Sequence, residues 1–112
     1  MPANQAINMS VTNQETVVKI NLNDLQNGQI TDFFKWQNFS FAMNLNNNNK
    51  LVLHLLIPDY PEMQSLLHTL QDCIALIPVG HFDQLKINTN NILAETITRG
   101  FAISNHLQWI RG

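Results

Sequence analysis

Apolar and polar positions alternate with a period of two over much of this chain, a pattern typical of half-buried β-strands. One such run covers residues 7–11 and a second covers residues 16–22, with the polar residues 12–14 between them. A short polar connection of this kind joins antiparallel strands. These runs therefore predict an antiparallel pair, in which the short first strand lies at the edge of the sheet.

The clearest alternation flanks four consecutive asparagines, Asn46 to Asn49. Asparagine tolerates the left-handed backbone region and hydrogen-bonds its own backbone, so this run predicts a hairpin turn between residues 39–45 and 50–57. The second of these runs is apolar on both of its faces and is interrupted by His54. Such a strand is expected at the centre of a sheet that is covered on both sides.

Helical spacing replaces alternation after Pro58. A helix is predicted to start near Pro61 and to end at Pro78–Gly80, because proline favours the first helical position and proline and glycine end helices. Its apolar side consists of Met63, Leu66, Leu67, Leu70, Ile74 and Ile77. A short helical turn is expected near residues 23–27, and residues 31–36 are expected to form a second helical turn or a loop.

In the carboxyl-terminal third, the pattern predicts a short strand over residues 84–88 and a helix that begins at Ile92 and is capped by Asn90-Asn91. This helix is expected to run to about Arg99 and to stop at Gly100. Two alternatives remain open for residues 101–109. Either they form a last strand, or one helix runs from Asn91 to Trp109.

These elements predict an α+β fold in one small domain, residues 1–112. The predicted sheet is mixed, mostly antiparallel, and has about five to six strands with two to three helices.

Composition narrows the possible functions. Charged residues make up 12% of the chain, against about 25% in a typical soluble domain, and this weak electrostatic repulsion favours self-association, such as a homodimer. The lysines and arginines are scattered and the pI is 6.0, so no nucleic-acid partner is expected. No apolar run is long enough to span a membrane. Cys73 is the only cysteine and no secretory signal is visible, which predicts a cytoplasmic protein.

No catalytic motif emerges. The four histidines lack the spacing of a metal site, no glycine-rich phosphate loop exists, and no serine lies in a nucleophile elbow. Cys73 falls on the apolar side of its helix beside Asp72, which favours a core residue over a reactive thiol. We therefore expect no metal, no cofactor and no enzymatic activity.

The candidate interface or ligand patch is aromatic. Phe33, Phe34 and Trp36 lie close together in sequence, and clustered aromatic residues mark partner or ligand sites when they are exposed. The alternative is that this segment folds back as a lid over the sheet. His54 joins the candidate residues as the polar group of an otherwise apolar strand.

The pattern of Leu51 to Ile87 resembles a small βαβ repeat of cyanobacterial multidomain proteins. The resemblance rests on the sequence from Leu51 to Pro61, the amphipathic helix after it, residues 82–87 and Trp109. It implies a bacterial, non-enzymatic accessory module. The order of strands and helices is also similar to the anti-sigma-factor antagonist fold. That family carries a phosphorylatable serine or threonine before a glycine at the turn, whereas residues 58–61 contain neither.

The sequence thus predicts a small non-catalytic protein-interaction or regulatory module that is cytoplasmic and homodimeric. The alternative is a small-ligand-binding domain or minor enzyme, with its pocket near Phe33–Trp36 and His54.

Overall fold

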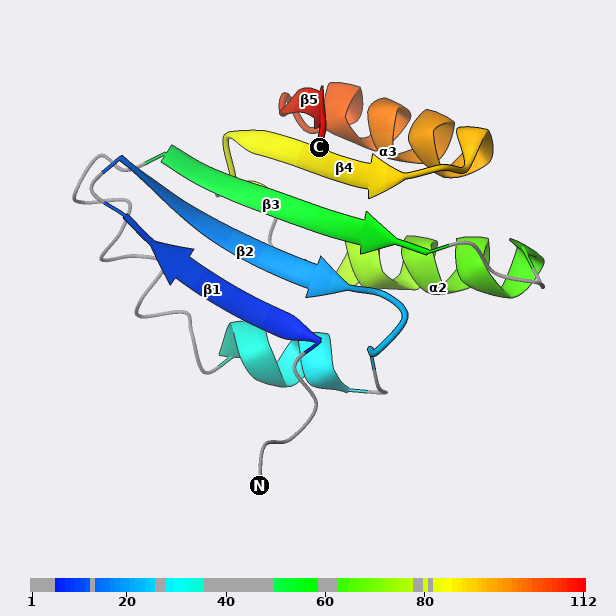
Figure 1. Cartoon of the computed structure of the whole chain (residues 1–112), viewed down its shortest axis with the longest axis horizontal. Helices are drawn as coiled ribbons and strands as arrows, with labels where there is room; N and C mark the ends of the chain where they lie inside the picture. The colour runs from blue at the N-terminus through cyan, green and yellow to red at the C-terminus, as the bar shows by residue number, and fades with distance from the viewer. Residues whose placement is uncertain are drawn as a thin grey trace.

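The computed structural model of this chain describes residues 6–12, 14–25, 28–35, 50–58, 63–77, 80 and 82–112. These residues form an α+β fold with one five-stranded sheet and helices (Figure 1). A helical segment over residues 29–35 precedes α2. The labelled elements are β1 (Ile7–Val11), β2 (Glu15–Asn21), β3 (Lys50–Ile57), α2 (Met63–Leu76), β4 (Gln84–Thr89), α3 (Ile92–Ser104) and β5 (Gln108–Arg111).

The strands lie in the sheet in chain order, β1-β2-β3-β4-β5. β1 pairs with β2 in the antiparallel sense, as predicted, and β1 lies at an edge. The other pairs, β2–β3, β3–β4 and β4–β5, are all parallel. The expected mostly antiparallel sheet is therefore wrong, because long crossover connections that contain a helix return the chain to the same end of the sheet.

The predicted hairpin also fails for β3. β3 pairs with β2 from Lys50 to Leu56 and with β4 from Val52 to Ile57, so both of its edges are occupied. No edge remains for an antiparallel partner from residues 39–45, which lie outside the described residues. Apolar residues on both faces identified β3 as a central strand correctly, but the described helices cover only one of its faces, so the expected cover on both sides is wrong.

The helices pack on one face of the sheet. Alternate residues of the central strands, such as Leu53 and Leu55, share a core cluster with Phe34, Leu70 and Ala94, which come from the three helical elements. Crossovers between parallel strands are right-handed, so successive crossovers that advance in one direction place their helices on one side. We call this side the covered face, and Figure 1 looks onto the opposite side, the open face.

The end of the chain combines the two alternatives for residues 101–109. Of the predicted cap Asn90-Asn91, Asn91 caps α3, since its Oδ1 accepts a hydrogen bond from the Ala94 N–H at 2.9 Å. The helix continues through Gly100 to Ser104, and the strand begins only at Gln108. Between them His106 has a φ of +61°, a left-handed conformation that turns the chain back toward the sheet.

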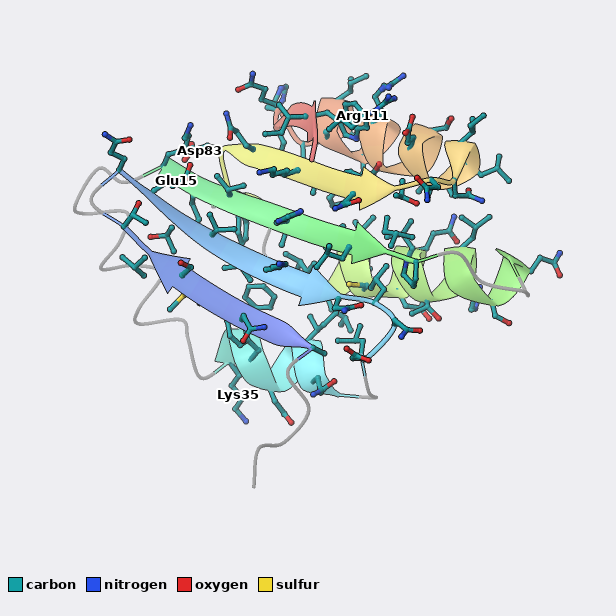
Figure 2. The ribbon with its side chains drawn as sticks, in the orientation of Figure 1. Glu15, Lys35, Asp83 and Arg111 are labelled. Carbon is teal, nitrogen blue, oxygen red and sulfur yellow. The ribbon has the colours of Figure 1, made fainter. Side chains whose placement is uncertain are left out.

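Asp83 aligns three strands at their amino ends (Figure 2). Its carboxylate accepts from the Leu51 N–H at 2.9 Å, and its own N–H donates to the Leu51 carbonyl at 2.8 Å. Its carbonyl accepts from the Gln108 N–H at 3.1 Å. These bonds join the loop before β4 to β3 and β5, so they support the register that brings the candidate site residues together.

Candidate functional site

The parallel register places three nitrogen-bearing side chains in one row across the open face. Lys19 of β2 lies opposite His54 of β3, which in turn lies opposite Lys86 of β4. Neighbouring strands are about 4.8 Å apart, so these residues are direct neighbours across the sheet. We call Lys19, His54 and Lys86 the basic row.

Apolar side chains flank the basic row on both sides. Two positions toward the amino ends, Val17 of β2 pairs with Val52 of β3, and Val52 is only 2% exposed. Two positions toward the carboxyl ends, half-buried Leu56 lies between Asn21 and Asn88. The open face is therefore neither a purely polar surface nor a second core, because it carries a cationic row between apolar neighbours.

The open face is positive although the chain carries a net charge of −2. The register places Lys19, Lys50 and Lys86 on this face of β2, β3 and β4, while Glu15 is the only carboxylate among these open-face strand positions. Glu15 Oε1 lies 3.9 Å from Lys50 Nζ, which leaves the lysines of the basic row without a carboxylate partner in the described residues. The sequence expectation of scattered cations is therefore wrong for this face.

His54 lies at the centre of this row with an unsatisfied ring nitrogen. Its Nε2 is buried and has no hydrogen-bond partner within the described part of the chain. A Cβ atom on Gly112 would come within 3.2 Å of that nitrogen, so the backbone of Gly112 lies against the imidazole. Burial lowers the His54 pKa below 6.5, and the charges of Lys86 and Lys19 lower it further. The imidazole is therefore neutral at pH 7.

A cavity adjoins the row at the carboxyl ends of the parallel strands, where ligands bind in many parallel sheets. Its volume is about 340 Å³, and its lining is rich in asparagine: Asn21, Asn23, Leu56, Ile57, Pro58, Asn88, Thr89 and Asn90. Side chains at this end also hold the turns in place. Asn21 Oδ1 accepts from the Asn23 N–H at 3.0 Å, and Thr89 Oγ1 accepts from the Asn91 N–H at 3.1 Å.

Two of the aromatic candidates, Phe33 and Phe34, lie on the covered face of the sheet. Phe34 is 5% exposed and belongs to the core, with its ring 5.1 Å from that of Phe33 and 6.4 Å from that of Phe82. Phe33 is half-buried, and Trp36 lies outside the described residues. This part of the segment therefore covers the sheet, the second of the two alternatives. Phe34 and His54 lie on opposite faces, so they do not line one pocket.

A second cavity of about 280 Å³ lies between the helical segment 29–35 and α2. Its lining comprises Leu25, Gly28, Ile30, Thr69, Asp72, Cys73 and Leu76. Burial raises the pKa of the Cys73 thiol to about 12, so this cysteine is a core residue and not a nucleophile. No three metal-ligating side chains come together in the described ranges.

Comparison with known proteins gives no relative: no family model, no curated protein and no solved structure matches this chain. The resemblance to the cyanobacterial repeat stays a prediction. Among the described helices, none has the length and apolar character needed to cross a membrane.

Proposed function

We propose that this protein is a non-catalytic interaction module that works as a homodimer, joined through the outer edge of β5. The observation that carries the proposal is an edge strand with unpaired backbone groups beside exposed apolar residues of α3. Dimers with two-fold symmetry are the commonest oligomers, and an open strand edge is a ready template for pairing.

Hydrogen bonds to β4 define which groups of β5 point outward. The Gln108 N–H donates to the Asp83 carbonyl at 3.1 Å, and the Gly112 N–H donates to the Ile87 carbonyl at 2.7 Å. Backbone groups of successive strand residues alternate in direction. The N–H and C=O groups of Trp109 and Arg111 therefore point away from β4, and no described residue pairs with them.

This edge is self-complementary. If two β5 strands pair in the antiparallel sense, Trp109 of one copy lies opposite Arg111 of the other, and the outward groups of both residues form hydrogen bonds. The two sheets then join into one continuous sheet. Arg111 is already oriented by Glu95, with Nη2 and Oε1 2.9 Å apart, and this pair limits the side-chain freedom lost on association.

α3 adds apolar surface at the same edge. Ile92 is 77% exposed and Ile103 is 71% exposed, and a separation of eleven residues is about three helical turns. They therefore lie on one side of the helix, with Arg99 between them. The Arg99 guanidinium lies 4.3 Å from the centre of the Trp109 ring, which shows that this side of α3 borders β5. Two copies joined at β5 would bring these isoleucines close to the two-fold axis.

The proposal is tested by sedimentation velocity over a range of protein concentrations. We expect a dimer for the unmodified chain. Arg111→Pro removes an outward N–H without removing a hydrogen bond to β4, so it should give a monomer. Arg111→Ala is the matched control, because it also loses the ion pair to Glu95 but keeps the N–H, and it should remain a dimer.

Folding of each variant is checked by circular dichroism before the comparison. A monomeric unmodified chain would overturn the proposal. A folded Arg111→Pro variant that remains a dimer would show that the interface does not lie at β5. Ile103→Lys should weaken the dimer, whereas Leu76→Lys changes another exposed apolar side chain, on α2, and should leave it intact.

A further inference from the structure

We infer that the open face binds an acidic segment of another protein, seated on the basic row of Lys19, His54 and Lys86. This inference goes beyond the proposed dimer and does not depend on it, because the row spans β2, β3 and β4 and the dimer uses the outer edge of β5. The partner is defined by its chemistry: carboxylate side chains with apolar side chains between them.

Charge complementarity selects an acidic partner. Lys19 and Lys86 are separated by two strand spacings, about 10 Å, with the neutral imidazole between them. A segment in the polyproline II conformation that crosses the strands rises about 3.1 Å per residue and returns to the same side every three residues, so carboxylates three residues apart match this separation. The net charge of the chain as a whole is −2, which means that the attraction is local to this face.

Apolar neighbours favour a peptide segment over a simple ion. Half-buried Val17 and Leu56 lie two positions before Lys19 and two positions after His54, on the same face as the basic row. Apolar side chains of a bound segment would cover them and remove the remaining surface from water. The asparagine-lined cavity at the carboxyl ends of the strands supplies amide donors for one end of the segment.

His54 makes binding depend on pH. The charged groups nearest to it on this face are Lys19 from β2 and Lys86 from β4, the backbone of Gly112 follows β5, and Glu15 and Lys50 lie four positions toward the amino ends. A bound carboxylate offsets the two ammonium charges and favours a protonated imidazole. Because Gly112 covers Nε2, the carboxylates of the bound segment would act on the imidazole through their charge and not through a hydrogen bond to Nε2. Binding should therefore strengthen as the pH falls below 6.5, the unperturbed value of a histidine.

The test is a fluorescence anisotropy titration with a labelled peptide in which glutamates three residues apart are separated by leucines. The matched probe has glutamine in place of each glutamate. We expect binding of the acidic peptide and none of the neutral one. Lys19→Glu and Lys86→Glu should each weaken binding by about tenfold or more, because each replaces an attraction by a repulsion.

Lys35→Glu is the matched control variant. It makes the same change of charge on the exposed Lys35 of the helical segment 29–35, which points away from the sheet in Figure 2. It should leave the affinity within about twofold, since charges separated by more than about 10 Å are largely screened at 0.1 M salt. His54→Gln should bind the peptide but lose the strengthening at low pH. Equal binding of the two peptides, or equal weakening by Lys35→Glu and Lys19→Glu, would overturn the inference.

Two further titrations identify a different anionic partner. A single-stranded oligonucleotide and vesicles that contain phosphatidylserine present phosphate groups in place of carboxylates. If either binds through Lys19 and Lys86 while the acidic peptide does not, the acidic-segment inference is wrong. The peptide titration is repeated on Arg111→Pro. Binding that persists in this variant separates the basic row from dimer formation, so failure of one proposal is distinguishable from failure of the other.

Discussion

The two faces of β3 carry similar residues and have different structural roles. Leu55 is 0% exposed and packs under the helices, whereas its neighbour Leu56 points to the open face and remains half-buried. On the open face the same strand places His54 between two lysines. An apolar strand can therefore form a core with one face and a binding surface with the other, and the helices determine which is which.

The largest expected effect comes from replacing a leucine by alanine on each face of β3. Leu55→Ala should lower the free energy of unfolding by about 2–5 kcal/mol, because it leaves a cavity in the core. Leu56→Ala should lower it by only about 1 kcal/mol, since water already reaches that side chain. Urea unfolding monitored by circular dichroism measures both. Equal losses would mean that the open face is as tightly packed as the core.

Two buried threonines on the covered side of the sheet differ in whether their hydroxyl groups form hydrogen bonds. Thr16 and Thr98 are both 0% exposed, but Thr16 Oγ1 has no hydrogen-bond partner in the described part of the chain. Thr98 Oγ1 accepts from Trp109 Nε1 at 3.1 Å and donates to the Ala94 carbonyl at 2.8 Å. Thr16→Val should therefore stabilise the protein by about 1 kcal/mol, and Thr98→Val should destabilise it by about 1–3 kcal/mol. If both variants shift the midpoint temperature of thermal unfolding in the same direction, the explanation from hydrogen bonding of the two hydroxyl groups is wrong.

His54 provides the corresponding test on the open face. His54→Leu removes the buried unsatisfied nitrogen and should raise stability at pH 7 by about 1 kcal/mol. The His54 pKa is lowered in the folded protein, so the unfolded chain binds more protons below pH 6.5. Stability from this group is complete above pH 6.5 and is lost as the pH falls through the folded-state pKa. His54→Leu should therefore reduce the loss of stability on acidification, measured by urea unfolding at several pH values.

The smallest effect is expected at the exposed end of the open face. Glu15 and Lys50 are separated by 3.9 Å, and their side chains are well exposed. Surface pairs of this kind contribute little, so Glu15→Gln should change the free energy of unfolding by no more than about 0.5 kcal/mol. The same urea experiment measures it. A larger loss would show that this pair helps to hold β2 against β3.

The local pattern of apolar and polar residues predicted most of the strands and helices, but it did not predict which strands pair. Alternation located β1, β2 and β4, and helical spacing located α2, with Asn91 as the cap of α3. The hairpin prediction failed because the pattern of residues 50–57 indicates only that the strand is central. The pattern does not indicate which strands lie beside β3. Gly100 was a misleading stop signal, because the packing of α3 on the sheet outweighs the cost of about 1 kcal/mol for a helical glycine.

The candidate site was only partly visible in the sequence. His54 was identified because it interrupts an apolar strand, but the predicted pocket shared with Phe33–Trp36 is wrong, since His54 and Phe34 lie on opposite faces of the sheet. Lys19 and Lys86 were not identified, since they are 35 and 32 residues away from His54 in the chain. A comparison of equivalent positions in the parallel strands would have found them. Phe34 was misjudged as a surface candidate because aromatic clusters occur in cores as well as at interfaces.

The sequence by itself determined the elements of this protein, because capping, helical spacing and alternation act between residues that are close in the chain. It also determined that the thiol of Cys73 is buried on the apolar side of α2. Only the tertiary structure decided that β2 to β5 are parallel, that the helices share one face, and that Lys19, His54 and Lys86 form one row. These features depend on register between residues 24 to 35 positions apart, and a shift of one residue would turn every side chain of a strand to the other face.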